Sequence, residues 1–257
     1  MVGFNADDAR DTDRSYLSPE IVNQRLQTIE AMALREGERV LDAGCGSGLL
    51  SELISLRVGK SGQVTGVDLS EDMLALARNR CEALGNVTLK RGSVTGLDLE
   101  SGSFDVASCI QTLLYVENTM AALGELYRVL KSRGRVAILE TDWRGAVLNS
   151  PDPATTRKVL DAWDAAVANP GLPPRLTQML LEAGFSAIRV RAIPVMNAAY
   201  NENGFSVGML KYMSRNAVRQ GVLDDDEASQ WLKRIFDLRQ QQAYFFCVNR
   251  FLFTAVK

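Results

Sequence analysis

A glycine-rich stretch near the start of the chain constrains its fold more than any other feature. Residues 39–50 read RVLDAGCGSGLL. Val40 and Leu41 suit the end of a buried strand, and apolar residues recur at helical spacing after the last glycine. The alternating glycines allow a tight turn and let a ligand approach the backbone closely. The stretch therefore predicts a strand, a glycine turn and a helix whose first N–H groups are free.

Two kinds of ligand use such a turn, and the residues around it distinguish them. A dinucleotide site wants the pattern G-x-G-x-x-G, but Leu49 stands where that pattern has its third glycine. Asp42 would also lie close to a pyrophosphate and repel it. A ligand that carries a cation, such as the sulfonium and amino groups of S-adenosylmethionine (SAM), fits an acidic turn better. A strand, turn and helix that bind nothing remain the third possibility.

A second acidic residue favours a nucleoside ligand. Residues 63–68, QVTGVD, form a short β-rich run that ends at Asp68, and Ser70 then suits the N-cap of a helix. In nucleotide-binding folds, an acid about 20 residues after the glycine turn binds the ribose. We therefore expect the Asp68 carboxylate to accept hydrogen bonds from both ribose hydroxyls.

The D-x-G-x-G-x-G pattern that begins at Asp42, together with Asp68, resembles the first motifs of the class I SAM-dependent methyltransferases. Within that family the chain is similar to the type 11 group, which includes the ubiquinone and menaquinone biosynthesis methyltransferases. The resemblance runs from about residue 39 to residue 142. It implies a Rossmann-like three-layer α/β sandwich with a seven-stranded, mostly parallel sheet. It also implies an antiparallel last strand, Tyr244–Val256, beside Arg135–Thr141, and it implies SAM as cofactor with S-adenosylhomocysteine as product.

The resemblance also implies which residues hold the cofactor. An N-terminal helix folds over it in related enzymes, so Arg14 and Tyr16 are expected at the methionine end of SAM. Ser93 stands where relatives commonly have an acid for the adenine; its hydroxyl can still hydrogen-bond an amine, and Asp98 is a second candidate. The expected cofactor-binding residues are Tyr16, Asp42, Gly44, Cys45, Gly46, Asp68, Leu69, Met73, Gly92, Ser93, Val94, Ile110 and Gln111.

The chain is expected to form a single domain over residues 1–257, with a core large enough for that length. Residues 1–36 are expected to form an N-terminal helical cap and residues 37–142 the SAM-binding core. Two helical insertions, residues 143–183 and 197–242, then interrupt the last strands. They branch from the ligand-binding edge of the sheet, so we expect them to form a substrate lid.

The absence of histidine limits the chemistry, because proton transfer must then use a carboxylate, Tyr, Lys, Arg or water. Side chains just beyond the fourth and fifth strands lie at the edge where such sheets bind ligands. On this ground the expected catalytic residues are Asp142, Tyr115 and Gln111. The expected substrate-binding residues are Tyr115, Trp143, Tyr200 and Tyr212. An alternative is that Asp142 caps a turn and Trp143 packs in the core.

Composition excludes several other functions. The net charge is −2 and no basic run is dense enough for a phosphate backbone, so nucleic acid is not expected as a partner. No apolar run approaches membrane-spanning length, and the polar N-terminus does not resemble a signal peptide. The four cysteines are scattered and show no metal-ligand spacing. A cytoplasmic monomer or homodimer without a metal is the expectation.

These observations predict a small-molecule methyltransferase that transfers the SAM methyl group to N, O or C by in-line displacement. Many relatives carry His or Arg-Asn where this chain has Leu114 and Tyr115, so quinone C-methylation does not carry over. The first alternative is a SAM-binding protein, or an enzyme of another reaction class, that does not transfer the methyl group. The second is a nicotinamide oxidoreductase, against which Asp42 and Leu49 argue.

Overall fold

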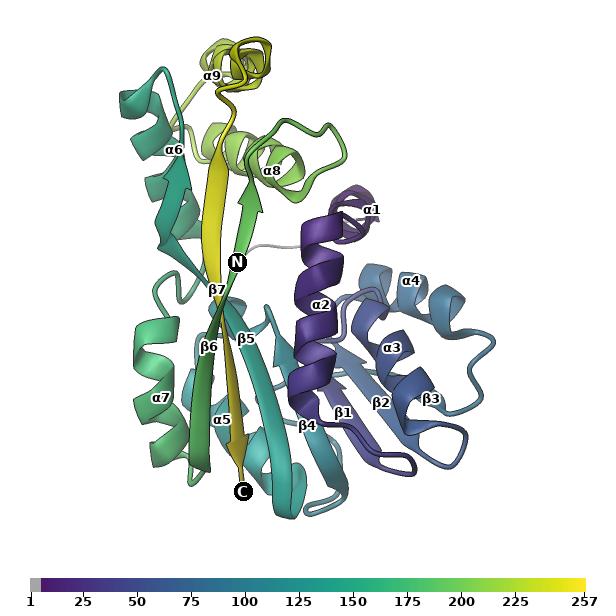
Figure 1. Ribbon diagram of the computed structural model, residues 1–257. Coiled ribbons are helices and arrows are strands. Elements are labelled where there is room, and N and C mark those ends of the chain that lie inside the picture. The colour runs from purple at the N-terminus through teal and green to yellow at the C-terminus, as the bar shows by residue number, and fades with distance from the viewer. Residues whose placement is uncertain (1–5) are drawn as a thin grey trace.

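The computed structural model describes residues 6–257, and their side chains from Ala9 onward (Figure 1). In the described chain one seven-stranded sheet has the order β3-β2-β1-β4-β5-β7-β6. Neighbouring strands from β3 to β5 pair in parallel, and β7 pairs antiparallel with β5 and β6. The sheet and its antiparallel last strand are as predicted. The strands are β1 Arg39–Ala43, β2 Gln63–Asp68, β3 Val87–Arg91, β4 Phe104–Ile110, β5 Leu130–Leu148, β6 Ser186–Asn197 and β7 Phe246–Val256.

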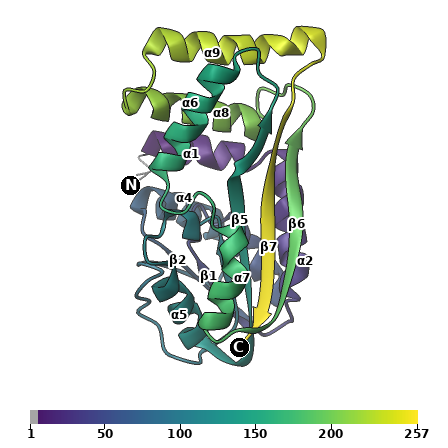
Figure 2. The same cartoon turned by 90° about the vertical axis from the view of Figure 1, so that its left-hand side faces the viewer.

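Helices cover both faces of the sheet and make three layers (Figures 1 and 2). The face covered by α2, α3 and α4 lies opposite the face covered by α5 and α7. The α-helices are α1 Ala6–Ser15, α2 Pro19–Met32, α3 Leu49–Val58, α4 Glu71–Cys81, α5 Thr119–Val129, α6 Pro153–Ala166, α7 Pro173–Glu182, α8 Phe205–Arg219 and α9 Asp225–Asp237. Two short 3₁₀ helices are η1 Leu113–Tyr115 and η2 Leu238–Gln241.

Local sequence signals account for where several helices begin. Ser18 precedes α2, which has Pro at its first turn, where a missing N–H costs nothing. Ser70 caps α4 by accepting from the Met73 N–H, and Asn118 caps α5 by accepting from the Ala121 N–H. These caps set where each helix starts after its strand, and so they fix the loops that face the ligand edge.

Strands β5, β6 and β7 continue past the other strands and carry α6, α8 and α9 at their far ends (Figure 1). The buried apolar residues of this part form a separate cluster, which we call the upper cluster; it includes Trp143, Trp163, Phe205, Trp231 and Val248. Two further clusters lie between the sheet and its covering helices. The upper cluster therefore stands above the carboxyl edge of the parallel strands, where a lid was expected.

The structure divides the first expected insertion differently from the prediction for residues 143–183. Residues 143–148 continue strand β5 and pair with β7 across a bulge. Helix α7 does not belong to the upper cluster, because Leu176 and Leu180 are buried in the core between the sheet and α5. Besides the end of β5, α6 and its flanking loops are the part of this segment that belongs to the upper cluster. The second insertion, residues 197–242, contains α8, α9 and η2.

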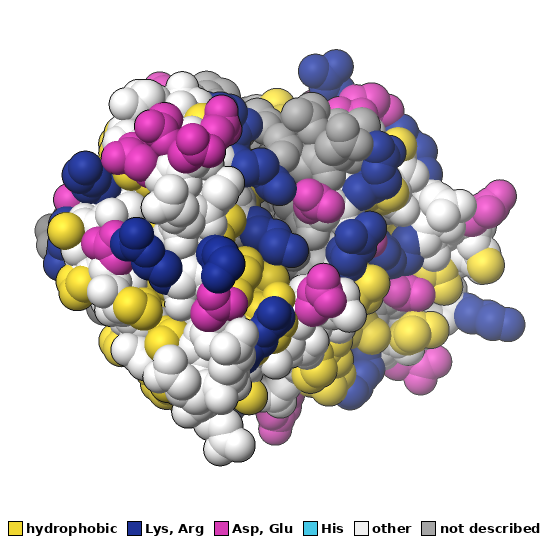
Figure 3. Space-filling view, turned by 90° about the horizontal axis from the view of Figure 1, so that it is seen from above, with side chains coloured by type: hydrophobic (Ala, Val, Ile, Leu, Met, Phe, Trp, Pro, Cys, Tyr) yellow, Lys and Arg dark blue, Asp and Glu magenta, His cyan; other side chains and the backbone are white. Residues whose placement is uncertain are grey.

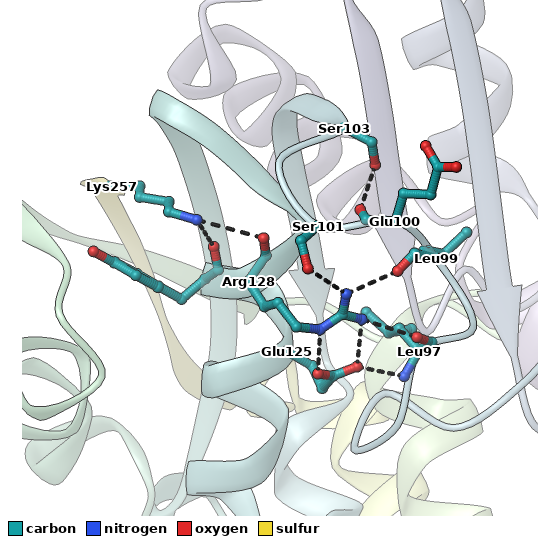
Figure 4. A network of polar contacts seen from close by, with 9 residues as sticks. Leu97, Leu99, Glu100, Ser101, Ser103, Glu125, Arg128 and Lys257 are labelled. Atoms are coloured by element: carbon teal, nitrogen blue, oxygen red, sulfur yellow. Dashed lines mark hydrogen bonds and ion pairs between the residues drawn. The ribbon is translucent and has the colours of Figure 1, made fainter.

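Polar contacts fasten the end of β7 to α5 (Figure 4). Lys257 Nζ donates to the carbonyl oxygens of Tyr127 and Leu130 at 2.6 and 2.8 Å. Arg128 of α5 forms an ion pair with Glu125, and its guanidinium donates to the Leu97 and Leu99 carbonyls. Carbonyl groups at the end of a helix need such donors. Lys257 thereby satisfies carbonyl groups at the C-terminal end of α5.

Candidate active site

A cavity of about 790 Å³ lies at the carboxyl ends of β1, β2 and β4, below α1 and α2. Its size is within the range of roughly 300–1,000 Å³ that is typical of small-molecule sites. Gly44 in the turn after β1 has a φ of +76°, and a Cβ there would lie 2.1 Å from Thr112 Oγ1. Glycine is therefore required at this position both by the backbone conformation and by the close approach of the loop after β4.

Asp68 ends β2 and organises the glycine turn. Its Oδ2 accepts the Gly46 N–H at 2.8 Å, and its Oδ1 accepts the Ser70 N–H at 2.9 Å. Each carboxylate oxygen can accept more than one hydrogen bond, so both oxygens keep capacity for a ligand hydroxyl. The carboxylate is thus held rigidly in the cavity wall and still has lone pairs to offer a diol.

Asp42 lies at the end of β1, and 1% of its surface is exposed. The Ser51 and Ser108 hydroxyls donate to its two oxygens at 2.6 and 2.9 Å. Burial raises the pKa of Asp42 to about 6, against the lowering effect of these two hydrogen bonds. The carboxylate is therefore largely ionised at neutral pH and contributes negative charge to the cavity wall.

The thirteen residues expected to bind the cofactor come together in this cavity, whereas Arg14, also expected at the methionine end, lines the neighbouring cavity instead. They are Tyr16, Asp42, Gly44, Cys45, Gly46, Asp68, Leu69, Met73, Gly92, Ser93, Val94, Ile110 and Gln111. Asp98, the second candidate for the adenine, is exposed and does not line the cavity.

A second cavity of about 350 Å³ adjoins the first and lies between α1 and α8. Thr12, Tyr16 and Tyr115 line both cavities, so the two are neighbours across these side chains. The second cavity has aromatic walls and a charged rim, and Figure 3 shows Lys and Arg side chains gathered around a hollow on this face. Its aromatic residues are Tyr16, Tyr115, Trp163, Phe205 and Tyr212, and its charged residues are Asp11, Arg14, Glu202, Lys211 and Arg215.

Three residues predicted for the acceptor site lie outside both cavities. Trp143 is buried in the upper cluster and packs edge-on against Trp163, with ring centroids 5.6 Å apart. Tyr200 packs against Phe236 and Tyr244. Asp142 remains in the β5 ladder opposite Asn249. Asp142 and Trp143 lie away from the cavities because β5 continues past Thr141 to Leu148, so these residues extend a strand instead of turning into the site.

Tyr115 and Tyr212 do line the second cavity, and Gln111 lines the first. Burial raises the pKa of Tyr115 well above its ordinary value, with smaller contributions from Tyr16 and Tyr212. Its phenol is therefore neutral at physiological pH and suits a hydrogen-bond donor better than a base. The Gln111 amide is engaged with β5, because its Nε2 donates to the Leu139 carbonyl and its Oε1 accepts from Thr141.

Arg250 and Glu140 are buried charged residues near the site that were not among the expected site residues. Arg250 of β7 lines the first cavity with 1% of its surface exposed. Glu140 of β5 is fully buried, and its Oε1 accepts the N–H groups of Thr112 and Leu113 at 3.0 and 2.7 Å. The one available signal was alternation in β7, where Val248, Arg250 and Leu252 share the buried face.

Burial also raises the pKa of Glu140 to about 8, against the lowering effect of hydrogen bonds from the loop after β4. Its other oxygen, Oε2, has no hydrogen-bond partner. Glu140 thus holds the loop that carries Gln111 and Tyr115, and it is mostly protonated at neutral pH.

The strand order, the antiparallel β7, the glycine turn and the acid that ends β2 define the Rossmann-like fold of class I SAM-dependent methyltransferases. Comparison with known proteins agrees with this class. Residues 40–134 match the family described as "Methyltransferase domain". Over this segment the chain is similar to the class I SAM-dependent methyltransferases, whose cofactor is SAM.

Among curated proteins, the chain is 31% identical over 209 residues to an uncharacterized 37.1 kDa protein in transposon TN4556 of Streptomyces fradiae. That match covers 80% of this chain and 60% of the relative. The chain is also 38% identical over 117 residues to the demethylmenaquinone methyltransferase of Staphylococcus aureus. This second match covers 46% of this chain and 48% of the relative. The chain therefore spans about half to three fifths of the length of these relatives.

Among solved structures, phosphoethanolamine N-methyltransferase 2 of Haemonchus contortus, in complex with SAM, superposes with a TM-score of 0.65 and 20% identity. The match covers 100% of this chain and 60% of that chain. At this identity the likeness establishes the fold alone.

No helix in residues 6–257 is both long and apolar enough to cross a bilayer. No group of three or more His, Cys, Asp or Glu side chains in the described part is arranged to hold a metal ion.

Proposed function

We propose that this protein transfers the methyl group of SAM to an N, O or C nucleophile of a small molecule and releases S-adenosylhomocysteine. The observation that carries the proposal is the pair of adjoining cavities. The first contains the glycine turn and Asp68, and the second meets it across Tyr16 and Tyr115. Methyl transfer by in-line displacement needs a cofactor site and an acceptor site that meet at one point.

The residues present fit the nucleoside half of SAM. Asp68 keeps free lone pairs for the two ribose hydroxyls, although it already accepts the Gly46 and Ser70 N–H groups. The Ser93 hydroxyl lines the same cavity and can accept a hydrogen bond from an amine such as that of adenine. Gly44 and Gly46 bring the backbone close to whatever occupies the turn.

SAM supplies an electrophilic methyl group, so the chain has to bind, orient and exclude water rather than provide a strong base. Tyr16 and Tyr115 line the junction between the cavities and present aromatic surface there. The neutral Tyr115 hydroxyl can orient an acceptor by hydrogen bonding. Gln111 and Glu140 act through position, because their polar groups hold the loop after β4 against β5.

A proton released by the acceptor needs a path that does not use histidine. Asp142, expected in this role from the sequence, does not line either cavity. Glu202 and Asp11 are the carboxylates that line the second cavity. We propose that one of them receives the proton directly or through water, with Asp11 partly engaged by Arg215 at 3.4 Å.

The second cavity favours a small acceptor with an aromatic or aliphatic body. Its walls contain Tyr16, Phe205 and Tyr212 among other rings, and its volume of about 350 Å³ suits a compact molecule. The named relatives differ in their acceptors, since one name refers to a demethylmenaquinone and another to phosphoethanolamine. The acceptor class is therefore proposed from the cavity and not from them.

The four cysteines are all free, and three of them are buried. Free thiols in this number are typical of proteins in a reducing compartment. We therefore propose that the enzyme works in the cytoplasm.

The proposed function is tested first by calorimetry and then by a methyl-transfer assay. SAM and S-adenosylhomocysteine should bind with micromolar or tighter affinity, whereas NAD should not bind; tight NAD binding would instead favour an oxidoreductase. Methyl-labelled SAM is then incubated with a panel of amines, phenols and quinols, and mass spectrometry should find a product that has gained CH₂. Binding of SAM without any labelled product across the panel would favour a SAM-binding protein of another reaction class.

A further inference from the structure

Arg250 is a buried cation without a counter-ion in the described part of the chain. Its Nη1 donates to Gln24 Oε1 at 2.5 Å, and its guanidinium lies over the rings of Phe205 and Tyr16, 4.8 and 5.8 Å from their centroids. Among the side chains from Ala9 onward, no carboxylate forms an ion pair with it, and its Nε has no hydrogen-bond partner. Arginine stays charged in proteins, and a buried charge costs free energy unless it is paired.

Glu140 is the carboxyl group that acts most strongly on the charge of Arg250, but it does not supply the missing negative charge. Glu140 is fully buried, and one of its oxygens is used by the N–H groups of Thr112 and Leu113. Its pKa of about 8 means that it is mostly protonated at neutral pH. Among the side chains that the structure describes, the Arg250 guanidinium therefore forms no ion pair with a carboxylate.

The position of Arg250 shows which ligand can provide that anion. Arg250 of β7 lines the first cavity together with Gln24, Arg25 and Thr28 of α2. The acids Asp42, Asp68, Glu71 and Asp72 line it from β1, β2 and α4, on the other side of β4 and β5 in the sheet, and Arg91 of β3 lines it beside Asp68. Arg25 is less available, because its Nη2 donates to the Tyr16 carbonyl at 2.6 Å. A ligand with hydroxyls at one end and a carboxylate at the other matches this arrangement.

We propose that Arg250 binds the α-carboxylate of the methionine half of SAM through its guanidinium N–H groups. This inference rests on the proposed function, and it moves the recognition of the methionine end from the N-terminal helix to β7. Arg14, expected there from the sequence, lines the second cavity and not the first. Because Arg250 lines only the first cavity, the carboxylate of the cofactor fits it better than that of an acceptor.

The test compares two ligands that differ only at the amino-acid end. S-adenosylhomocysteine carries the α-carboxylate, whereas 5′-methylthioadenosine has the same nucleoside and thioether without it. Calorimetry on Arg250→Met should show the dissociation constant of S-adenosylhomocysteine rising by about 30-fold or more, since charge-assisted hydrogen bonds are lost. The dissociation constant of methylthioadenosine should stay within about twofold of wild type, because its binding makes no use of the cation.

A second variant keeps Arg250 in place, in case Arg250→Met does not fold. Gln24→Glu puts a carboxylate beside the guanidinium, where Gln24 Oε1 now lies 2.5 Å from Nη1. This internal counter-ion competes with the ligand's carboxylate, so S-adenosylhomocysteine should bind about tenfold more weakly while methylthioadenosine is unaffected. Arg14→Met serves as the matched control, and it should leave both dissociation constants unchanged.

The possible results separate this inference from the proposed function. If Arg250→Met and Gln24→Glu both leave S-adenosylhomocysteine binding unchanged, or weaken both ligands equally, the assignment of Arg250 is wrong while SAM binding stands. If the acceptor's KM rises and S-adenosylhomocysteine binding does not change, the carboxylate belongs to the acceptor and the assignment is again wrong. A wild-type protein that binds neither ligand contradicts the proposed function and the inference together.

Discussion

At the residue scale, the glycine turn and the Asp68 carboxylate act as one unit, because Asp68 Oδ2 accepts the Gly46 N–H. Asp68→Ala should therefore lower SAM affinity by at least about tenfold, since hydrogen bonds to a charged acceptor are worth about 1.5–3 kcal/mol each before water replaces them in part. Calorimetry measures this loss. Asp98→Ala is the control, since Asp98 is an exposed carboxylate outside the cavity. An unchanged dissociation constant for Asp68→Ala would remove Asp68 from the cofactor site.

Gly44 gives a second residue-scale prediction. In Gly44→Ala the new Cβ would lie 2.1 Å from Thr112 Oγ1, so the turn and the loop after β4 must separate. We expect SAM affinity to fall by at least about tenfold, because this separation moves the cavity wall. The strain of a non-glycine residue at positive φ, about 1–2 kcal/mol, adds to the effect. Gly102→Ala is the matched control, with a φ of +63° and no atom within 4 Å of the new Cβ. Similar losses in both variants would show that backbone strain alone is responsible.

Glu140 gives a pH dependence whose sign follows from its raised pKa of about 8 against an ordinary value of 4.5. As the pH rises through this window, the unfolded chain ionises Glu140 and the folded protein does not, so the folded state loses stability. The wild-type free energy of unfolding should fall relative to Glu140→Gln by up to about 1.4 kcal/mol per pH unit. Urea denaturation of both proteins from about pH 5 to about pH 8 measures the difference. A constant difference would mean that Glu140 is ionised in the folded protein.

The residues that line the first cavity could be predicted because their signals are local. Asp42, the glycines and Asp68 lie at the ends of short strands, and the turn chemistry that places them is contained within a few residues. Arg250 could not be assigned in this way. Its position depends on the pairing of β7 with β5, where it lies opposite Thr141, and on a contact with Gln24, which is 226 positions away in the sequence.

At the element scale, α1 and α8 form opposite walls of the second cavity, and they touch through a glycine. A Cβ on Gly208 would lie 2.2 Å from Ser15 Oγ. Gly208→Leu should push α1 away from α8, and amide hydrogen exchange in residues 6–15 should become faster because the helix loses its packing. Gly124→Leu is the control, since Gly124 is exposed on α5 and has no atom within 4 Å of a new Cβ. Unchanged exchange in Gly208→Leu would mean that α1 is held by its other contacts.

The length of β5 explains why the acceptor side was predicted less well. The run from Arg135 to Thr141 is strongly apolar and β-rich, and the glycine at position 145 favoured an end to the strand soon afterwards. Instead, Val147 and Leu148 pair with Cys247 and Phe246 across a bulge. The pairing partner lies about a hundred residues further along the chain, so local propensity could not show that β5 continues.

At the scale of the whole molecule, three long strands join the upper cluster to the core beneath it. The pairing of β5 with β7 runs from Arg135 and Val256 at one end to Leu148 and Phe246 at the other. All three tryptophans, Trp143, Trp163 and Trp231, lie in the upper cluster. Tryptophan fluorescence therefore reports on that part of the molecule alone, whereas far-UV circular dichroism reports on the whole chain.

We expect one cooperative unfolding transition, because a continuous ladder cannot melt in its upper half without losing hydrogen bonds that hold the lower half. The urea midpoints from fluorescence and from circular dichroism should therefore coincide. A fluorescence midpoint at clearly lower urea would show that the upper cluster unfolds on its own.

Strand β6 is one of the two edge strands of the sheet, and its exposed edge affects how separate copies of the protein can associate. An exposed edge of this length is a template on which a neighbouring chain can add a strand. Arg189 and Arg191 are exposed along it, and Pro194 has no N–H to offer. If the β6 strands of two copies paired, the arginines would bring like charges together and Pro194 could donate no hydrogen bond to the other strand. At high concentration the protein should therefore resist strand-by-strand growth into fibrils.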